Sequence, residues 1–191
     1  MSDISSIVDI INSTLTNSTT GVMKDERFQR GKFYGLTELI TRGDETIPTL
    51  VDNNNKKIEV VINDSYPIQV YHRVLSVPPA EQNNDGFGDD INYTQNYSMK
   101  LVCINDRTKT KIDKFALTEA FLVGFPSQIA ETTFVSDYVK ATKVTVGEPD
   151  YVGVYTEEYN IPDTKIPPYI DFFSVNYTVS MEISKDCYSL C

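Results

Sequence analysis

A fourteen-residue segment close to the C-terminus alternates almost perfectly between apolar and polar residues. It reads DFFSVNYTVSMEIS over residues 171–184. Its apolar positions are Phe173, Val175, Tyr177, Val179, Met181 and Ile183. Successive side chains of a β-strand point to opposite faces, so the pattern predicts one strand whose odd face packs inward. At about 3.3 Å per residue the strand would be roughly 45 Å long, more than twice the usual length. A fold that contains it needs a large sheet.

Two segments show the three- and four-residue spacing of helices that are apolar on one side. The first follows the potential caps Ser2 and Asp3 and ends at the turn-forming residues 16–21. Its apolar positions are Ile4, Ile7, Val8, Ile11 and Leu15. The second follows the potential cap Asp113 and ends before Pro126. Its apolar positions are Leu117, Ala120, Phe121 and Gly124.

Four further segments predict strands. Residues 47–62 alternate around a polar turn and indicate a hairpin. Residues 68–77 are apolar on both faces, which is typical of a central strand, and Pro78 ends them. Residues 97–105 and 139–146 indicate two more strands.

The order of these elements predicts a single α+β domain over residues 1–191, because strands and helices do not alternate. We expect an antiparallel sheet flanked by the N-terminal helix and one crossing helix. Residues 22–46 leave two alternatives open, a strand pair or a short helix near Leu36 to Thr41. Residues 78–96 and 147–170 are rich in polar residues and predict two long loops.

Both predicted loops are about twenty residues long, and compact domains seldom carry such loops without a function. They and their flanks are rich in tyrosine, which is enriched where protein surfaces meet partners. We therefore expect an oligomer or partner interface to contain Tyr93, Tyr97, Tyr155, Tyr159 and Tyr169.

Composition excludes some classes of protein. The formal net charge of −10 argues against wrapping around nucleic acid, although DNA could still slide along such a surface. The N-terminus lacks the basic start and uninterrupted apolar core of a signal peptide, so synthesis inside a cell is expected. The chain has no run of eighteen apolar residues, so no membrane-spanning helix is predicted.

The residue types used in catalysis and metal binding form no recognisable motif. The single histidine, His72, lies mid-strand and is interpreted as structural. Cys187 and Cys191 could complete a zinc site only with Cys103 and His72 from distant strands, so a frayed tail is the simpler interpretation. The acidic loop at 83–90 lacks the ligand spacing of a calcium loop, and its GFG lacks the features of a phosphate loop. No catalytic residue, cofactor or metal is predicted.

A basic and aromatic stretch, RFQRGKFYG, begins at Arg27. Such mixtures occur in nucleic-acid modules, but this one is short and belongs to an acidic chain. We interpret it as a partner-facing or partly buried segment.

The four segments ISSIVDIINSTL, IQVYHRVLSV, FALTEAFLVGF and SVNYTVSMEIS supply a helix, a sheet strand, a crossing helix and a long closing strand. This order resembles the tail-terminator and neck-connector proteins of tailed bacteriophages over most of the chain. The resemblance implies a virion protein without an active site, made in the host cytoplasm. Its copies would form a homo-oligomeric ring that contacts adjacent portal, connector or tail proteins and leaves a channel for DNA. The loops and the end of the long strand would supply the contacts between subunits, the strand by pairing with a neighbouring chain.

Two other function classes stay open. One is a soluble β-rich module that binds a receptor or a carbohydrate with the tyrosine-rich loops, although the absence of Trp weakens the carbohydrate version. The other is a carboxylate-based hydrolase. Its candidate pairs, Asp89 with Asp90 and Glu157 with Glu158, are adjacent in sequence and would point apart in a strand.

Overall fold

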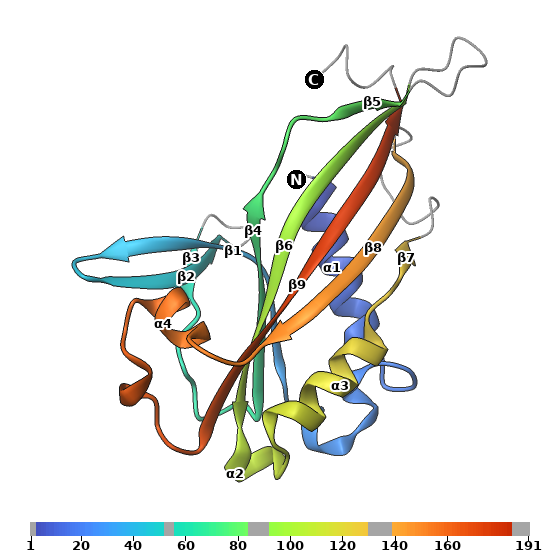
Figure 1. Cartoon of the computed structure of the whole chain (residues 1–191). Helices are drawn as coiled ribbons and strands as arrows, with labels where there is room; N and C mark the ends of the chain where they lie inside the picture. Colours follow the sequence, from blue (N-terminus) through green and yellow to red (C-terminus); the bar gives the residue numbers. More distant parts are fainter. Residues whose placement is uncertain (1–2, 52–55, 84–91, 130–138, 185–191) are drawn as a thin grey trace.

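The protein is described by a computed structural model over residues 3–51, 56–83, 92–129 and 139–184. Within these ranges nine strands form one mixed sheet with four α-helices beside it, so the fold is α+β (Figure 1). The strands are β1 (Lys32–Arg42), β2 (Glu45–Val51), β3 (Lys57–Glu59), β4 (Ile68–Ser76), β5 (Glu81–Asn83), β6 (Asn92–Asp106), β7 (Gln128–Ile129), β8 (Val139–Asp150) and β9 (Ile170–Ser184). The helices are α1 (Asp3–Leu15), α2 (Arg107–Thr110), α3 (Lys114–Gly124) and α4 (Val154–Tyr159), with single 3-10 turns η1 (Val22–Lys24), η2 (Glu26–Phe28) and η4 (Asp163–Lys165).

The strand order is β3-β2-β1-β4-β6-β9-β8-β7, with β5 paired to β6. Neighbours are antiparallel except β1 and β4, which run parallel from Lys32 opposite Gln69 to Thr37 opposite Arg73. The expected antiparallel sheet is therefore corrected to a mixed one. Parallel neighbours need a long connection, and here the β2–β3 hairpin and the segment after it provide that connection.

The long closing strand exists as predicted and occupies the middle of the sheet. β9 pairs with β6 along its whole length and with β8 from Ser174 to Ile183. Its odd face packs inward, since Phe173, Val175 and Tyr177 are buried. The expectation that its end pairs with a neighbouring chain is wrong over the described residues, because strands of the same chain already pair with both of its edges.

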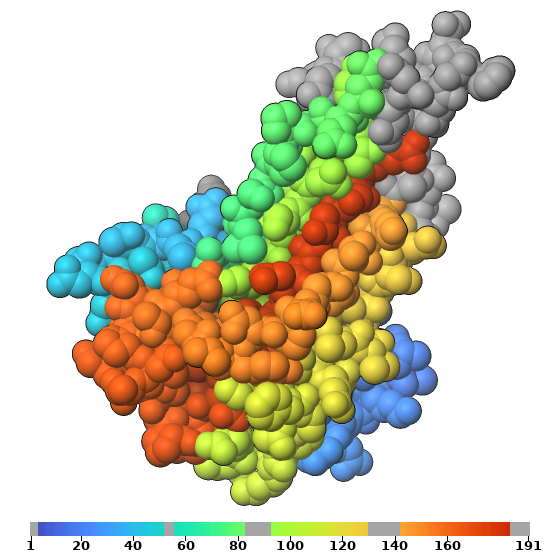
Figure 2. Space-filling model, viewed as in Figure 1, coloured from blue at the N-terminus to red at the C-terminus, as the bar shows by residue number. Residues whose placement is uncertain are grey.

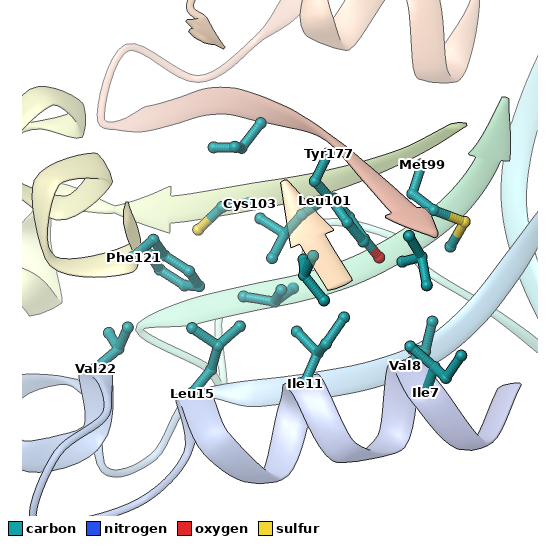
Figure 3. Close-up of a cluster of buried hydrophobic side chains, with 14 of the residues drawn as sticks. Ile7, Val8, Ile11, Leu15, Val22, Met99, Leu101, Cys103, Phe121 and Tyr177 are labelled. Atoms are coloured by element: carbon teal, nitrogen blue, oxygen red, sulfur yellow. The ribbon is translucent and has the colours of Figure 1, made fainter. Parts of the chain in front are cut away.

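One face of the sheet is covered by α1 and α3 (Figure 3). In Figure 3 the apolar side chains of α1, among them Ile7 and Ile11, point toward Leu101 and Tyr177 of the sheet. All five predicted apolar positions of α1 are buried. The predicted cap of the second helix is also confirmed, because the Asp113 carboxylate accepts hydrogen bonds from two backbone N–H groups of α3, at 2.9 and 3.0 Å.

The opposite face carries a smaller core beneath α4. Val154, Tyr155 and Tyr159 of α4 pack against the sheet residues Tyr71 and Phe172. The loop predicted over 147–170 is therefore wrong in large part, since β8 extends to Asp150 and α4 and η4 follow it. The spacing of the buried residues of α4 places them all on one side of the helix: Val154, Tyr155, Glu158 and Tyr159. A count of polar residues does not reveal this spacing.

Three other expectations have clear outcomes. The loop predicted over 78–96 is shorter, because β5 and the start of β6 occupy its ends, and residues 84–91 lie outside the described ranges. Of the alternatives for 22–46, the short helix near Leu36 is wrong, since β1 spans that stretch and pairs with β2. The hairpin over 47–62 is confirmed in β2 and β3, while its turn at 52–55 lies outside the described ranges.

Three long strands pair at one end of the sheet and form what we call the arm, whose inward face belongs to the core that includes α1 (Figure 1). The arm comprises the paired segments 92–99 of β6, 177–184 of β9 and 139–146 of β8. β5 borders one side of it. Along the same border, between β4 and β5, the chain carries Pro78 and Pro79, and Gln95 donates a hydrogen bond of 2.7 Å to the Pro78 carbonyl. Proline lacks the N–H that strand pairing requires, so this edge is protected against an incoming strand.

Candidate functional site

A buried carboxylate fixes α4 to the sheet. The Glu158 side chain has no exposed surface, and its Oε1 lies 2.5 Å from Arg73 Nη1. Tyr71 donates a hydrogen bond of 3.2 Å to Glu158 Oε2. Lys100 lies 2.5 Å from Glu157 Oε1 and 4.0 Å from Glu158 Oε1. Because buried charges need partners, the two cations and two carboxylates form a neutral cluster that holds α4 in place.

This cluster is unsuited to acid–base chemistry. Burial raises the pKa of the Tyr71 hydroxyl well above its usual value, and the same cause raises the pKa of Tyr159. Both hydroxyls therefore stay protonated at neutral pH, and Tyr159 donates a hydrogen bond of 2.9 Å to the Val60 carbonyl. A substrate cannot reach Glu158, because its side chain is fully enclosed. The adjacent pair Glu157 and Glu158 thus has a structural role in α4.

Beyond α4, the same side of the sheet presents a polar surface that we call the arm face. It consists of Thr94, Asn96 and Ser98 from β6, Thr178, Ser180 and Glu182 from β9, and Lys143 and Thr145 from β8. Ser180 donates a hydrogen bond of 2.7 Å to Asn96 Oδ1 across the strands. Figure 2 shows β6, β9 and β8 forming the visible surface there, and within the described residues no helix packs on it.

The arm face carries little net charge. It contains one cation, Lys143, and one carboxylate, Glu182, among hydroxyls and amides. The cations at its border with α4, Arg73 and Lys100, already lie against the carboxylates of α4. Another macromolecule could cover this polar surface at a small desolvation cost, because few charges would be removed from water.

The structure does not bring the five predicted interface tyrosines together. Tyr155 and Tyr159 are only 8% and 4% exposed, and their rings pack on each other and on Phe172 at centroid distances of 4.9 to 6.0 Å. Their aromatic surface thus serves the core of the chain itself and leaves little area for a partner. The polar residues around them predict a loop, whereas α4 turns both tyrosines toward the sheet.

The other three tyrosines lie at two ends of the sheet. Tyr93 and Tyr97 are half-buried on the arm, where they lie on the same face of the sheet as α1. Tyr169 is 37% exposed, just before β9 at the opposite end, and its carbonyl accepts a hydrogen bond of 2.9 Å from the Arg107 N–H. These three residues therefore cannot form one continuous surface with each other.

His72 belongs to a buried hydrogen-bonded group between β4, β9 and α1. Its Nδ1 lies 2.7 Å from the Tyr177 hydroxyl, and its Nε2 lies 2.9 Å from Asn12 Oδ1. Burial lowers the pKa of His72 to about 3, so the imidazole is neutral at physiological pH. Both ring nitrogens are engaged inside the protein, which is the environment of a structural histidine.

The remaining candidates from the sequence are also accounted for. Cys103 is buried, and burial raises the pKa of its thiol, whereas Cys187 and Cys191 lie outside the described residues. In the basic and aromatic stretch, Phe28 is buried and Arg27 pairs with Asp25.

Among the described residues, no group of three His, Cys, Asp or Glu could hold a metal ion. Over the same residues, every helix is too short or too polar to cross a membrane.

A groove between α3 and the segment that contains η1 and η2 was missed by the sequence analysis. Its volume is about 650 Å³, and its apolar lining includes Ala116, Ala120 and Val123 of α3 together with Val22 and Phe28. A signal for it existed in α3, where the apolar Val123 lies outside the predicted buried stripe and is exposed.

Comparison with known proteins adds no assignment, because neither a family model nor a curated protein sequence matches this chain.

Proposed function

We propose that this protein is a structural subunit of the neck or tail end of a tailed bacteriophage, where copies form a ring around a channel for DNA. The observation that carries the proposal is the arm, a sheet end whose inward face packs in the core with α1 and whose other face is polar, nearly neutral and free of any described helix. The order of helix, sheet, crossing helix and long closing strand supports the same class of protein.

The length of the arm favours assembly. β6 and β9 have 15 residues each, which corresponds to roughly 50 Å, whereas the 13 residues of α1 span about 20 Å. α1 alone therefore cannot cover the whole length of these strands. A lone domain gains little from leaving one face of such long strands uncovered, whereas a ring subunit can use that face to contact its neighbours or an adjacent ring.

The charge of the molecule suits a channel for DNA. Tight binding to the DNA backbone requires cations that neutralise several phosphates. Here Arg73 and Lys100 are neutralised by Glu158 and Glu157, and the whole chain has a net charge of −10. A wall made from the arm face would let DNA pass without holding it, and no sequence-specific contact is expected.

The contacts between subunits are expected on faces of the sheet and its helices. β9 is paired on both edges, and prolines protect the border beside β4 and β5, so strand addition at these places is disfavoured. Side-chain surfaces then have to provide the ring contacts and the contacts with adjacent portal, connector or tail proteins. This replaces the strand-pairing joint that the sequence suggested.

Light scattering coupled to size-exclusion chromatography tests the proposal on the purified chain. We expect a single species whose mass is a multiple of the 21.6 kDa subunit and which appears as a closed ring in electron micrographs. Images of phage particles with this protein labelled should place the ring between head and tail or at the tail end. A species that stays monomeric at high concentration, together with specific binding to a glycan panel, would instead favour the soluble binding module.

A further inference from the structure

Polar groups from four elements form a hydrogen-bonded network between α1 and the sheet, which we call the His72 network. The Tyr177 hydroxyl of β9 lies 2.7 Å from Nδ1 of His72 in β4, and Nε2 of His72 lies 2.9 Å from Oδ1 of Asn12 in α1. The Asn12 amide nitrogen donates a hydrogen bond of 2.8 Å to the Tyr34 carbonyl of β1. In Figure 3 the Tyr177 side chain extends from the sheet toward α1. The network therefore joins the helix to three strands.

The network fixes the position of every proton in it. Because a backbone carbonyl can only accept, the amide nitrogen of Asn12 has to face Tyr34, and its oxygen then faces His72. Nε2 of His72 must therefore carry the hydrogen, which leaves Nδ1 as the acceptor for the Tyr177 hydroxyl. A neutral imidazole with the hydrogen on Nε2 satisfies every contact.

A second proton on His72 does not fit the network. His72 is fully buried, and within the described ranges no carboxylate forms an ion pair with it. Arg73, the next residue, pairs with Glu158 on the opposite face of the sheet. A proton on Nδ1 would force the Tyr177 hydroxyl to turn its own hydrogen away, and a buried charge without a counterion is costly. Since Asn12 of α1 lies against Nε2, α1 has to move away before water can solvate the charged ring.

The titratable groups near these contacts, on the described parts of the elements packed around His72, supply no compensating charge. They are Glu38 of β1, Cys103 of β6, Tyr177 of β9 and Asp9 of α1. Burial raises the pKa values of the Cys103 thiol and the Tyr177 hydroxyl, so both stay neutral in acid. Glu38 is exposed to solvent. Burial also raises the pKa of Asp9, so a proton on Asp9 favours the docked helix and opposes the effect of His72.

α1 can separate from the sheet without disrupting it. Within the described ranges no backbone hydrogen bond joins α1 to a strand, whereas every strand is paired with at least one neighbour. Residues 17–20, which follow the helix, are all exposed. Movement of α1 as a unit therefore breaks its side-chain packing and the two contacts of Asn12, and it leaves the strand pairing intact.

We propose that the His72 network makes the docking of α1 sensitive to acid, so that a second proton on His72 releases the helix while the sheet stays folded. The release takes place within a single copy and is independent of the ring proposed above.

The direction of the pH dependence follows from the two states of His72. In the docked state burial lowers the pKa of His72 to about 3, whereas release restores the ordinary value of 6.5. Between these values the released state binds more protons, so lowering the pH favours release. From about pH 7 to about pH 5 the equilibrium constant for release should increase about twenty-five-fold.

Native-state hydrogen exchange on the wild-type chain measures the release. Amides of residues 8–15 are followed by mass spectrometry at a series of pH values and corrected for the pH dependence of intrinsic exchange. We expect their opening equilibrium to increase by the factor given above. Amides of β9, which is paired on both edges, should open far less often at every pH, because they exchange only when the sheet itself opens.

The variant Asn12→Asp reverses the expected pH dependence. It places a carboxylate of nearly the same shape against Nε2, and that carboxylate raises the pKa of His72 above its ordinary value. Docking of α1 is then strongest in acid and weakens as the pH rises. Ser13→Asp is the matched control, since it adds the same charge at an exposed position of α1 and should keep the wild-type direction.

Two further variants separate the contributions of individual groups. His72→Gln cannot titrate, so the release of α1 should lose the acid-induced increase. Asp9→Asn removes the opposing carboxyl, so its increase should be at least as large as that of the wild-type chain.

Three outcomes would overturn the proposal. Amides of α1 that open no more often than those of β9 at every pH would show that the helix leaves only when the whole protein unfolds. An increase of wild-type size in His72→Gln would exclude His72 as the responsible group. An Asn12→Asp profile with the wild-type direction would exclude the contact at Nε2.

Discussion

At the scale of single residues, buried polar side chains have specific partners inside the protein. His72 is held between Tyr177 and Asn12, and burial lowers its pKa from 6.5 to about 3. In the unfolded chain the pKa returns to its ordinary value. Between these two values the unfolded state binds more protons than the folded state, so stability falls as the pH falls through this window.

We expect the free energy of unfolding to drop by about 2 kcal/mol between about pH 7 and about pH 5 because of His72 alone. Urea denaturation at a series of pH values measures it. His72→Gln has no titrating imidazole, so its curve should lack this drop. Burial raises the pKa values of Asp9 and Asp171, so these two carboxyls make the protein more stable as the pH falls. Both are present in the wild-type chain and in the variant, so they do not affect the comparison. A drop of equal size in the variant would contradict the assignment to His72.

At the scale of elements, the short helix α4 depends on one ion-pair cluster. The six residues of α4 are too few for a helix to be stable alone, so packing and the pair of Glu158 with Arg73 have to hold it. Glu157 and Glu158 are adjacent in sequence but differ in burial, since the Glu157 side chain is 48% exposed and the Glu158 side chain is fully enclosed. The two therefore form a matched pair for mutation.

Glu158→Gln should lower the free energy of unfolding by about 3 kcal/mol, because it leaves Arg73 without its buried partner. Glu157→Gln should cost about 1 kcal/mol or less, because the ion pair that it removes is open to solvent on the carboxylate side. Chemical denaturation of both variants provides the comparison. Equal losses would show that burial does not govern the strength of this cluster.

At the scale of the whole molecule, net charge determines how strongly the protein binds DNA. A net charge of −10 repels phosphates, and the cations at the border of the arm face, Arg73 and Lys100, are neutralised. Non-specific DNA binding by cationic proteins has dissociation constants of about 10⁻⁴ to 10⁻⁶ M at physiological salt. A subunit that lines a DNA channel should bind more weakly than this range.

Fluorescence anisotropy with labelled duplex DNA should therefore detect no binding by the wild-type protein at physiological salt. Replacing Thr145 and Thr178 on the arm face by lysine should produce binding that weakens steeply as salt is added. Two lysines introduced on another exposed surface would add the same charge and would serve as the control. Micromolar binding by the wild-type chain would contradict a non-adhesive arm face.

Whether a part of the fold could be predicted depends on how far apart its interacting residues lie in the sequence. The apolar side of α1, the cap Asp113 and the inward face of β9 depend on residues within a few positions of each other, so their spacing revealed them. α4 was missed because its polar residues conceal a helix whose burial depends on Arg73 and Lys100, more than fifty positions earlier. The groove was missed because α3 and the segment of η1 and η2 meet only in the folded chain.

The sequence alone therefore determined that this protein has a long strand with one apolar side, an amphipathic first helix and an α+β fold. Periodicity reports which side of an element avoids water, and that is a local property. Only the tertiary structure decided that β9 lies between β6 and β8, that α4 closes over a buried carboxylate, and that the outer side of α3 stays exposed. Pairing and coverage depend on contacts between distant segments, and the strand that looked open to a neighbouring chain is occupied on both edges by its own.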